Sequence, residues 1–333
     1  MDKVVNIIDV AKKAGVVKST VSNVLTGKKY VSPELQKKVL DACEELDYHP
    51  NFYASALSGK KSNIIALLLE NSDDIEQKMY KNLIVACIKE ASLHGYSLLV
   101  YYNSDKERLL DTLRKGCAPI DGAIIMSPCL HDERVVQFDS QHADFVVIGR
   151  PENSEAISYV DVDNVGLARD TTLKLMELSG LDNVYLVNSG EEMTISQDRI
   201  NGFVEACTKC GLNAEGRILS RAAFVGDDVQ EEACAKVQAG SIFITCDDIV
   251  AQKIYGVAAE KNLVVGEDVS VFSLGRSKDS GTFTPPLSYA KQDYGLLGKT
   301  AVSVLISLIE EKAQKSQIFI KSEIIFGNSV KKF

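Results

Sequence analysis

A short polar run near the start of the chain contains the side chains that proteins use to bind DNA. The run comprises Lys18, Ser19, Thr20, Ser22 and Asn23. Lysine can bind a guanine edge, asparagine suits an adenine edge, and hydroxyl groups bind phosphate oxygens. We therefore expect Lys18, Ser19 and Asn23 to face the bases of a duplex, with Thr20 and Ser22 near its phosphates.

Three short amphipathic helices are predicted around this run. The first is capped by Asn6 and ended by Gly15, since glycine readily adopts the left-handed conformation at a helix end. The second carries the polar run and ends near Gly27, and the third begins at Ser32 and Pro33. This arrangement is typical of a helix-turn-helix, although a generic helical hairpin has the same spacing. The apolar residues expected to face the shared core are Ile7, Val10, Ala11, Ala14, Val21, Val24, Leu25, Leu35, Val39, Cys43 and Leu46.

Residues 7–51 resemble the headpiece of the lactose-repressor (LacI/GalR) family, whose run reads approximately D-V-A-x-x-A-G-V-S-x-x-T-V-S-R-V-L-N-G. The resemblance implies a DNA-binding transcriptional repressor that acts as a dimer and reads a pseudopalindromic operator. It also implies DNA contacts from Tyr30 and Asn51. The matching residues are Asp9, Val10, Ala11, Ala14, Gly15, Val16, Thr20, Val21, Ser22, Val24, Leu25 and Gly27.

Two departures from the family pattern affect which bases the second helix would read. Val17 stands where the family commonly has serine, so a helix cap and a phosphate donor are lost. Asn23 stands where arginine is common, and the first arginine of the chain is Arg108. Bidentate arginine–guanine contacts are therefore not expected from this segment, and the operator sequence does not follow from these residues.

Residues 50–62 are predicted to form a hinge. Pro50 stops the third helix, and residues 52–57 fit a short helix that would be marginal alone. By resemblance to the family, this helix folds on DNA and Leu57 wedges a base step open, with Ala54 one turn before it. The alternative is a flexible linker with an incidental leucine.

From residue 64 onward, apolar strands alternate with amphipathic helices. This alternation predicts an α/β fold with parallel sheets covered on both faces, and two successive series predict two similar lobes. The expected helices lie near 76–94, 105–115, 132–142, 165–179, 197–210, 227–239 and 249–262. The expected strands are 64–69, 97–102, 122–126, 145–149, 183–188, 217–220, 241–245 and 269–274, with a terminal strand in 322–330.

The family resemblance extends through this region, which is similar to the two-lobed periplasmic sugar-binding proteins. It implies a headpiece at residues 1–49, a hinge at 50–62 and an effector-binding and dimerisation domain at 63–333. Because no heptad repeat follows the terminal strand, we expect a dimer and not a coiled-coil tetramer. The expected lobes are an N-lobe at about 63–162 and 292–322, and a C-lobe at about 163–291 and 323–333. The motifs that carry the resemblance are YSLLVYYNSD, IDGAIIMSP, VVIGRP, YVDVDN, RINGF, GEDVSVFSLG and PPLSYAKQDYGLLGKTAV.

A small-molecule effector is expected between the lobes, at the carboxyl ends of the strands. By resemblance, Arg199 would clamp it, because a guanidinium fork suits hydroxyls or a carboxylate. Asp163 and Asp247 match other ligand positions, although Asp247 or its neighbour Asp248 could instead cap a helix.

The chemistry of that effector depends on a few further positions. Tyr80 and Phe224 match places where aromatic rings stack on a ligand, but both could equally belong to the core. Gly275 stands where the family often has an acidic acceptor for sugar hydroxyls, and Arg276, also expected to bind effector, follows it. Losing an acid and gaining a cation favours a phosphorylated or carboxylate-bearing sugar derivative. A protein corepressor or a non-sugar ligand is the alternative.

Composition and the remaining motifs favour a regulator over an enzyme or a transport receptor. Residues 1–62 hold ten lysines and seven acids, a net charge of +3, whereas the whole 333-residue chain carries −9. The remainder is therefore acidic, as expected for a DNA-binding module fused to another domain. No membrane span or secretory signal is evident, so we expect a cytoplasmic protein. No dinucleotide, Walker or nucleophile-elbow motif predicts catalysis or a cofactor, and the C-x-x-C of Cys207 and Cys210 is more typical of free thiols than of a metal site.

Overall fold

The computed structural model describes residues 5–26, 29–48, 61–70, 78–103, 120–190, 192–225, 230–275 and 283–331. The chain forms two compact units, Met1–Ser62 and Asn63–Phe333. The expected hinge contacts Asn51, Ala54 and Leu57 lie outside the described residues, as do Arg276 and the helix expected at 105–115. Those expectations stay predictions.

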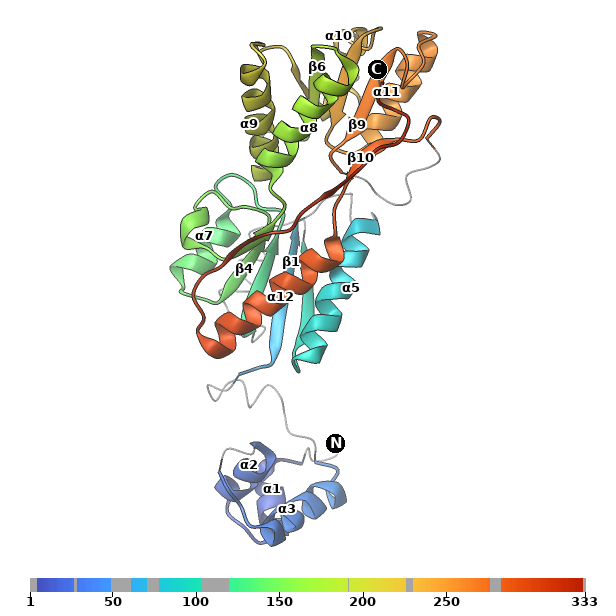
Figure 1. Ribbon diagram of the computed structural model, residues 1–333. Coiled ribbons are helices and arrows are strands. Elements are labelled where there is room, and N and C mark those ends of the chain that lie inside the picture. The colour runs from blue at the N-terminus through green and yellow to red at the C-terminus, as the bar shows by residue number, and fades with distance from the viewer. Residues whose placement is uncertain are drawn as a thin grey trace. The chain divides into compact units, whose positions relative to one another are not determined.

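The N-terminal unit contains the helices α1 (Ile7–Ala14), α2 (Lys18–Thr26) and α3 (Pro33–Glu45) (Figure 1). Asn6 caps α1 in a reciprocal box: its side chain accepts from the Asp9 backbone at 3.3 Å, and the Asp9 carboxylate accepts from the Asn6 backbone at 3.1 Å. Gly15 ends α1 in the left-handed region at a φ of 69°. Ser32 precedes α3 but makes no side-chain cap, so the fixed φ of Pro33 starts that helix instead.

A small apolar core holds these helices together. Val10 of α1, Val21 of α2 and Val39 of α3 are fully buried in one cluster. Burying each valine contributes about 1.5–3 kcal/mol, so these few contacts hold α2 in its orientation. Because Val21 faces the core, the opposite side of α2 faces solvent.

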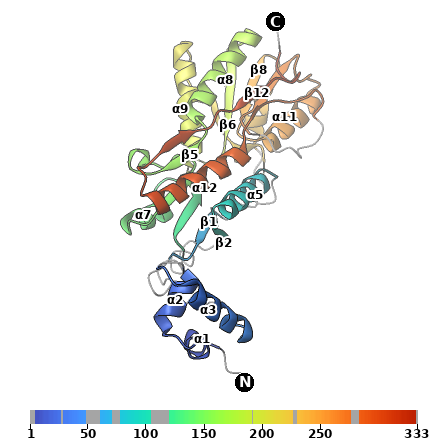
Figure 2. The same cartoon turned by 60° about the horizontal axis from the view of Figure 1, so that its bottom comes forward.

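The second unit begins with an N-lobe built on a six-stranded sheet (Figures 1 and 2). Its strands are β1 (Ile64–Glu70), β2 (Ser97–Asn103), β3 (Gly122–Met126), β4 (Phe145–Ile148), β5 (Tyr159–Asp161) and β11 (Gln317–Phe319). Its helices are α5 (Lys78–Leu93), α7 (Glu133–Ser140), η2 (Ser154–Ala156) and α12 (Tyr294–Glu311). The strand order is β11-β5-β4-β3-β1-β2, and every neighbouring pair is parallel.

The C-lobe is built on a second six-stranded sheet. Its strands are β6 (Asn183–Asn188), β7 (Ile218–Ser220), β8 (Ser241–Thr245), β9 (Val269–Ser273), β10 (Ser288–Lys291) and β12 (Glu323–Ile325). Its helices are α8 (Asn164–Ser179), α9 (Thr194–Lys209), η3 (Arg221–Ala223), α10 (Glu231–Ala235) and α11 (Asp248–Glu260). The order is β12-β10-β9-β8-β6-β7, in which the β10–β12 pair is antiparallel and the others are parallel.

Both faces of each sheet are covered, as the continuous apolar strands predicted. In β1, Ile65 and Leu67 pack into one core, and Ala66 and Leu68 pack into another on the opposite face. This period of two follows from the alternation of side chains along a strand, and it confirms the predicted parallel sheets. None of the described helices is long and apolar enough to cross a membrane.

The chain crosses between the lobes after β5, after β10, and between β11 and β12. Figure 1 shows the last crossing as an extended segment that runs from the end of α12 in the N-lobe into the C-lobe. The strands at these crossings have only three or four residues. Strands this short give a weak periodic pattern, and β5, β10 and β11 were not among the sequence expectations, although the three-residue strands β7 and β12 were. The helix α12 was missed as well.

Candidate functional site

α2 presents the expected DNA-contacting residues at the surface of the N-terminal unit. The backbone N–H of Thr20 donates to the Val17 carbonyl at 2.9 Å, which starts the helix without a side-chain acceptor at position 17. The Tyr30 ring is 90% exposed, so it lies in water until a partner surface covers it. The exposed members of the expected set are Lys18, Ser19 and Tyr30, and the partly exposed members are Thr20, Ser22 and Asn23.

A buried arginine lies near the chain crossings of the second unit. Arg199 projects from α9 and is only 5% exposed. Its Nε donates to Asn164 Oδ1 at 3.3 Å, and its Nη1 donates to the Cys246 carbonyl at 3.2 Å. Burial lowers the pKa of this guanidinium, although the neighbouring Cys246 and Tyr294 oppose that change. Both hydrogen-bond acceptors are neutral, and no described carboxylate lies within ion-pair distance of Arg199.

The first crossing holds Asn164 in place beneath that arginine. Asn164 Nδ2 donates to the Val162 carbonyl at 3.1 Å and to Asp161 Oδ1 at 3.3 Å. The Asp161 carboxylate also accepts the backbone N–H groups of Val162 at 2.7 Å and Arg150 at 3.0 Å. Burial raises the pKa of Asp161 to about 7, and the negative charge of nearby Asp198 adds to the rise.

A bidentate ion pair joins the two lobes beside Asp161. Arg150 follows β4 in the N-lobe, and Asp198 lies on α9 in the C-lobe. Arg150 Nε donates to Asp198 Oδ2 at 2.9 Å, and Nη2 donates to the other carboxylate oxygen. Asp198 is 3% exposed, and its hydrogen bonds raise the pKa of Arg150. A fork-to-fork pair permits little rotation, so it constrains how the lobes meet.

Hydrogen bonds between two loops extend this contact. The Leu130 backbone N–H donates to the Glu192 carbonyl at 2.7 Å, and Thr194 Oγ1 donates to the Pro128 carbonyl at 3.1 Å. Pro128 and Leu130 lie in the loop that follows β3, whereas Glu192 precedes α9 and Thr194 is its first residue. Arg199 and Asp198 therefore lie on the helix whose start is pinned to the opposite lobe.

Asp247 has a structural role at the end of β8. Its Oδ1 accepts the Val250 backbone N–H at 2.9 Å and so caps α11. Its other oxygen accepts from Arg221 Nε at 2.7 Å. Asp248, the second member of the acidic pair, is 3% exposed. The sequence left open whether Asp247 or Asp248 caps a helix, and in the structure Asp247 does so. Both carboxylate oxygens of Asp247 accept hydrogen bonds from other residues of the chain.

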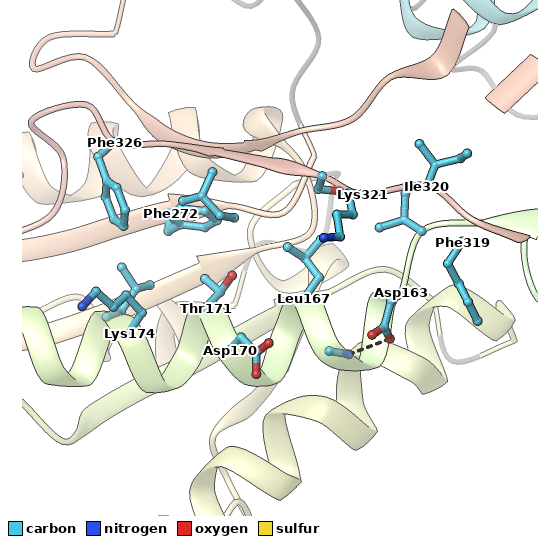
Figure 3. Close-up of a pocket in the computed structure, with 15 residues that line it drawn as sticks. Asp163, Leu167, Asp170, Thr171, Lys174, Phe272, Phe319, Ile320, Lys321 and Phe326 are labelled. Atoms are coloured by element: carbon cyan, nitrogen blue, oxygen red, sulfur yellow. Dashed lines mark hydrogen bonds between the residues drawn. The ribbon is translucent and has the colours of Figure 1, made fainter. Parts of the chain in front are cut away.

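Asp163 also caps a helix. Its Oδ1 accepts the Gly166 backbone N–H at 2.9 Å at the start of α8. Figure 3 shows it at the edge of a separate cavity, near Phe319. Asp163 was expected to bind effector, and that role stays a prediction; the residue of this turn that contacts Arg199 is the neighbouring Asn164.

The two aromatic candidates differ in position. Phe224 is 2% exposed and packs edge-to-face against Phe243 at 6.3 Å between ring centroids, so here it is a core residue. Tyr80 is half-buried against the N-lobe core and lies close enough to Tyr294 to affect that residue's pKa, which burial raises to about 12. Tyr294 in turn lies near Arg199, so Tyr80 is linked to the buried cluster through Tyr294.

The buried cluster contains residues that sequence reasoning did not single out. Arg150, Asp161, Asn164 and Asp198 stand in the motifs VVIGRP, YVDVDN and SQDRINGF, which had been noted only as family-like. A signal was present for Asp198, because it directly precedes Arg199. Nothing local indicated its pairing with Arg150, which lies 48 residues earlier.

Comparison with known proteins gives two matching family models. The model described as "Bacterial regulatory proteins, lacI family" matches residues 6–51, and the "Periplasmic binding protein-like domain" matches residues 179–330. Catabolite control protein A of Priestia megaterium is 27% identical over 98% of this chain and 99% of its own length. The HTH-type transcriptional repressor PurR of Vibrio parahaemolyticus is 25% identical over 97% and 98%.

Solved structures share the same fold. The Lac repressor bound to ONPG in its repressed state aligns with a TM-score of 0.78 and 23% identity, over 98% of this chain and 100% of that one. A complex of the transcriptional regulator CelR with cellobiose aligns with a TM-score of 0.70 and 23% identity, over 98% and 99%.

A helix-turn-helix unit followed by two lobes that enclose a buried polar cluster defines a transcriptional regulator with a ligand-sensing domain. Residues 6–51 match the lacI family of bacterial regulatory proteins, and the chain is similar to regulators of this kind along nearly its whole length. Its relatives along nearly the whole length are DNA-binding regulators and repressors.

Proposed function

We propose that this chain is a transcriptional repressor that binds operator DNA as a homodimer and responds to a small molecule held against Arg199 between its lobes. The observation that carries the proposal is the state of Arg199: a buried guanidinium with two neutral acceptors and no described carboxylate partner. The charges of Asp161 and Asp247 lie near enough to favour the guanidinium, but neither carboxylate pairs with it, so a ligand oxygen would reduce the remaining cost of its burial.

The ligand class follows from this cluster. A guanidinium fork favours a carboxylate, a phosphate or paired hydroxyls, so we propose a sugar derivative, with a negatively charged one preferred. The CelR relative holds cellobiose, which supports a carbohydrate-related ligand in this fold. Tyr80 supplies an aromatic surface near Tyr294, and Asn164 would orient Arg199. The cluster is assigned to binding and not to catalysis, in keeping with the regulators that make up the family.

Ligand binding would act on DNA through the lobes. A ligand that replaces or reinforces the Arg150–Asp198 bridge changes the free energy of one lobe arrangement relative to another. In a dimer, such a change would alter how two headpieces present α2 to two half-sites. Under this proposal Lys18, Ser19 and Asn23 read bases, and Thr20, Ser22 and Tyr30 contact the backbone.

The test uses the full-length protein and DNA from upstream of its own gene. Calorimetry with glucose 6-phosphate, gluconate and cellobiose is expected to show binding of at least one anionic compound, and Arg199→Gln should weaken it at least about tenfold. Arg169→Gln is the matched control, because Arg169 lies at the surface of α8 in exposed ion pairs. The same ligand should change DNA affinity in fluorescence anisotropy. Equal affinity for upstream and random DNA at all salt concentrations would contradict the repressor assignment.

A further inference from the structure

A cavity of about 640 Å³ lies between α8, the strand β9 and the C-terminal segment 319–326 (Figure 3). This volume is within the usual range of small-molecule sites. Neither Arg199 nor Asn164 lines it, so it is separate from the effector cluster proposed above. Its lining residues all belong to the described part of the chain.

Aromatic rings form much of the wall. Phe272 projects from β9, and Phe319 and Phe326 project from the two ends of the last crossing, as Figure 3 shows. Phe319 is 50% exposed and Phe326 is 39% exposed, although each belongs to a segment that packs on a core. Leu167 of α8 completes this apolar surface. Partial exposure of several large apolar side chains around one hollow is typical of a binding site.

Two hydroxyl groups in this apolar wall have no partner among the described residues. Thr171 is 6% exposed, and its Oγ1 makes no hydrogen bond; the same is true of the buried Oγ of Ser322 on the crossing opposite. Helical threonines usually satisfy this group by donating to the carbonyl four residues earlier. The adjacent Thr172 does so, with its Oγ1 donating to the Ala168 carbonyl at 2.7 Å. Thr171 therefore has an unpaired hydroxyl in the cavity wall that neighbouring atoms cover, and it pairs with a ligand once a small shift of the wall exposes it.

The charged side chains at the rim of the cavity do not favour an ionic ligand. The Asp163 carboxylate caps α8, Asp170 pairs with Arg169 at 2.9 Å, and Lys174 pairs with Glu177 at 2.8 Å. Lys321 also lines the cavity, so two lysines and two aspartates surround it and it has no strong preference for an anion or a cation. A ligand that fits this cavity has an apolar surface and one or two hydrogen-bonding atoms.

We propose that this cavity is a second ligand site, which takes a small uncharged molecule with an apolar ring body and a hydroxyl or carbonyl group that pairs with Thr171 and Ser322. Val162 at the first lobe crossing and Ile320 at the last also line it. A molecule bound there contacts both crossings, so it favours the lobe arrangement in which the cavity keeps its shape. The site is thus a regulatory one, coupled to effector and DNA binding; this regulatory part rests on the proposed function.

The experiment uses the full-length protein and the neutral fluorescent probe 2-naphthol. The chain contains no tryptophan, so probe fluorescence can be excited with little protein background. Saturable binding with one site per chain is expected. Thr171→Val should weaken it about fivefold, because it removes one hydrogen bond and keeps the side-chain shape. Thr172→Val is the matched control and should leave probe affinity unchanged, since that hydroxyl does not line the cavity.

A second variant fills the cavity from its other wall. Ser322→Phe should abolish probe binding, and calorimetric effector binding by the same variant would show that the lobes remain folded. Absence of saturable 2-naphthol binding to the wild type would overturn the site. Binding that is unchanged in both Thr171→Val and Ser322→Phe would overturn it as well, because the probe would then lie elsewhere.

The regulatory part has its own readout. A saturating concentration of 2-naphthol should change the DNA dissociation constant at least threefold in the wild type and leave it unchanged in Ser322→Phe. An unchanged dissociation constant in the wild type would overturn the coupling. Because probe binding is measured without DNA, a failure of the repressor assignment and a failure of the site give different results.

Discussion

The N-terminal unit and the two-lobed unit handle charge in opposite ways. α2 carries Lys18 in water, in a segment whose cations are all lysines. The lobes instead bury Asp198 at 3% exposure and Arg199 at 5%. Exposed charge costs little in folding and is screened by salt, whereas buried charge is costly unless it is paired and is screened much less by salt. Exposed charge on α2 suits a segment that first binds any duplex through its phosphates and then contacts the bases. Buried charge between the lobes suits a contact whose stability changes when a ligand binds.

Breaking the ion pair between the partly exposed Arg150 and the buried Asp198 should have the largest effect. Arg150→Ala leaves Asp198 buried without its partner, so we expect the free energy of unfolding of the two-lobed unit to fall by about 3 kcal/mol. Urea denaturation followed by circular dichroism measures this change. Arg169→Ala removes exposed ion pairs on α8 and should cost less than about 1 kcal/mol. Equal losses in the two variants would show that the Arg150–Asp198 bridge is not buried in solution.

The raised pKa of Asp161, about 7, predicts that stability depends on pH. An unfolded aspartate loses its proton near pH 4, whereas the folded carboxyl keeps it to about pH 7, so folding takes up a proton between these values. The stability from this group is complete below pH 4 and falls as pH rises toward 7, by about 2 kcal/mol between pH 5 and pH 7. Asp161→Asn should remove that decrease. Identical pH profiles of the free energy of unfolding would contradict the raised pKa.

On the exposed side of the comparison, Lys18→Ala should weaken operator binding by about 1.5 kcal/mol, roughly tenfold in Kd. If Lys18 contacts a phosphate, the slope of log affinity against log salt concentration should also fall by about 1. Fluorescence anisotropy over a salt series measures both quantities. Arg199→Gln should leave the slope unchanged, because that charge is buried in the other unit. A slope that changes in Arg199→Gln would remove the contrast between the two regions.

The smallest expected effect concerns the cap of α1. Asn6→Ala removes the reciprocal box with Asp9 and should cost the N-terminal unit about 1 kcal/mol. Ser32→Ala should cost close to nothing, since Ser32 makes no side-chain cap on α3. Hydrogen exchange of the α1 and α3 amides in the full-length protein measures both. A larger loss in Ser32→Ala than in Asn6→Ala would contradict the capping geometry.

Features that depend on near neighbours in the chain were predictable from the sequence. The capping box of Asn6, the left-handed Gly15 and the long apolar strands depend on residues within a few positions of one another, and all were found where the pattern placed them. The motifs of the headpiece likewise identified the helix-turn-helix, because a fixed spacing encodes the packing of α1 on α2. Short strands such as β5 were missed, since three residues show too little periodicity.

The effector cluster could be predicted only in part. Arg199 was identified by its motif, and the structure places it in a buried polar cluster. Its neighbours were not, because Asp163 and Asn164 differ by one position and the fold decides which of them turns toward Arg199. The same holds for Phe224. The sequence around an aromatic residue that follows a strand does not show whether its ring faces a ligand or packs in a core.

By itself, the sequence determined the class of the protein, the order of its longer strands and the polar face of α2, since these follow from local spacing. Tertiary structure alone decided which distant residues meet: Arg150 with Asp198 across the lobes, and Thr171 with Ser322 around one cavity. Such pairs lie 48 residues apart or more, and their contact depends on how the sheets and crossings pack. No local pattern encodes that packing, because it is the sum of many weak apolar contacts spread along the whole chain.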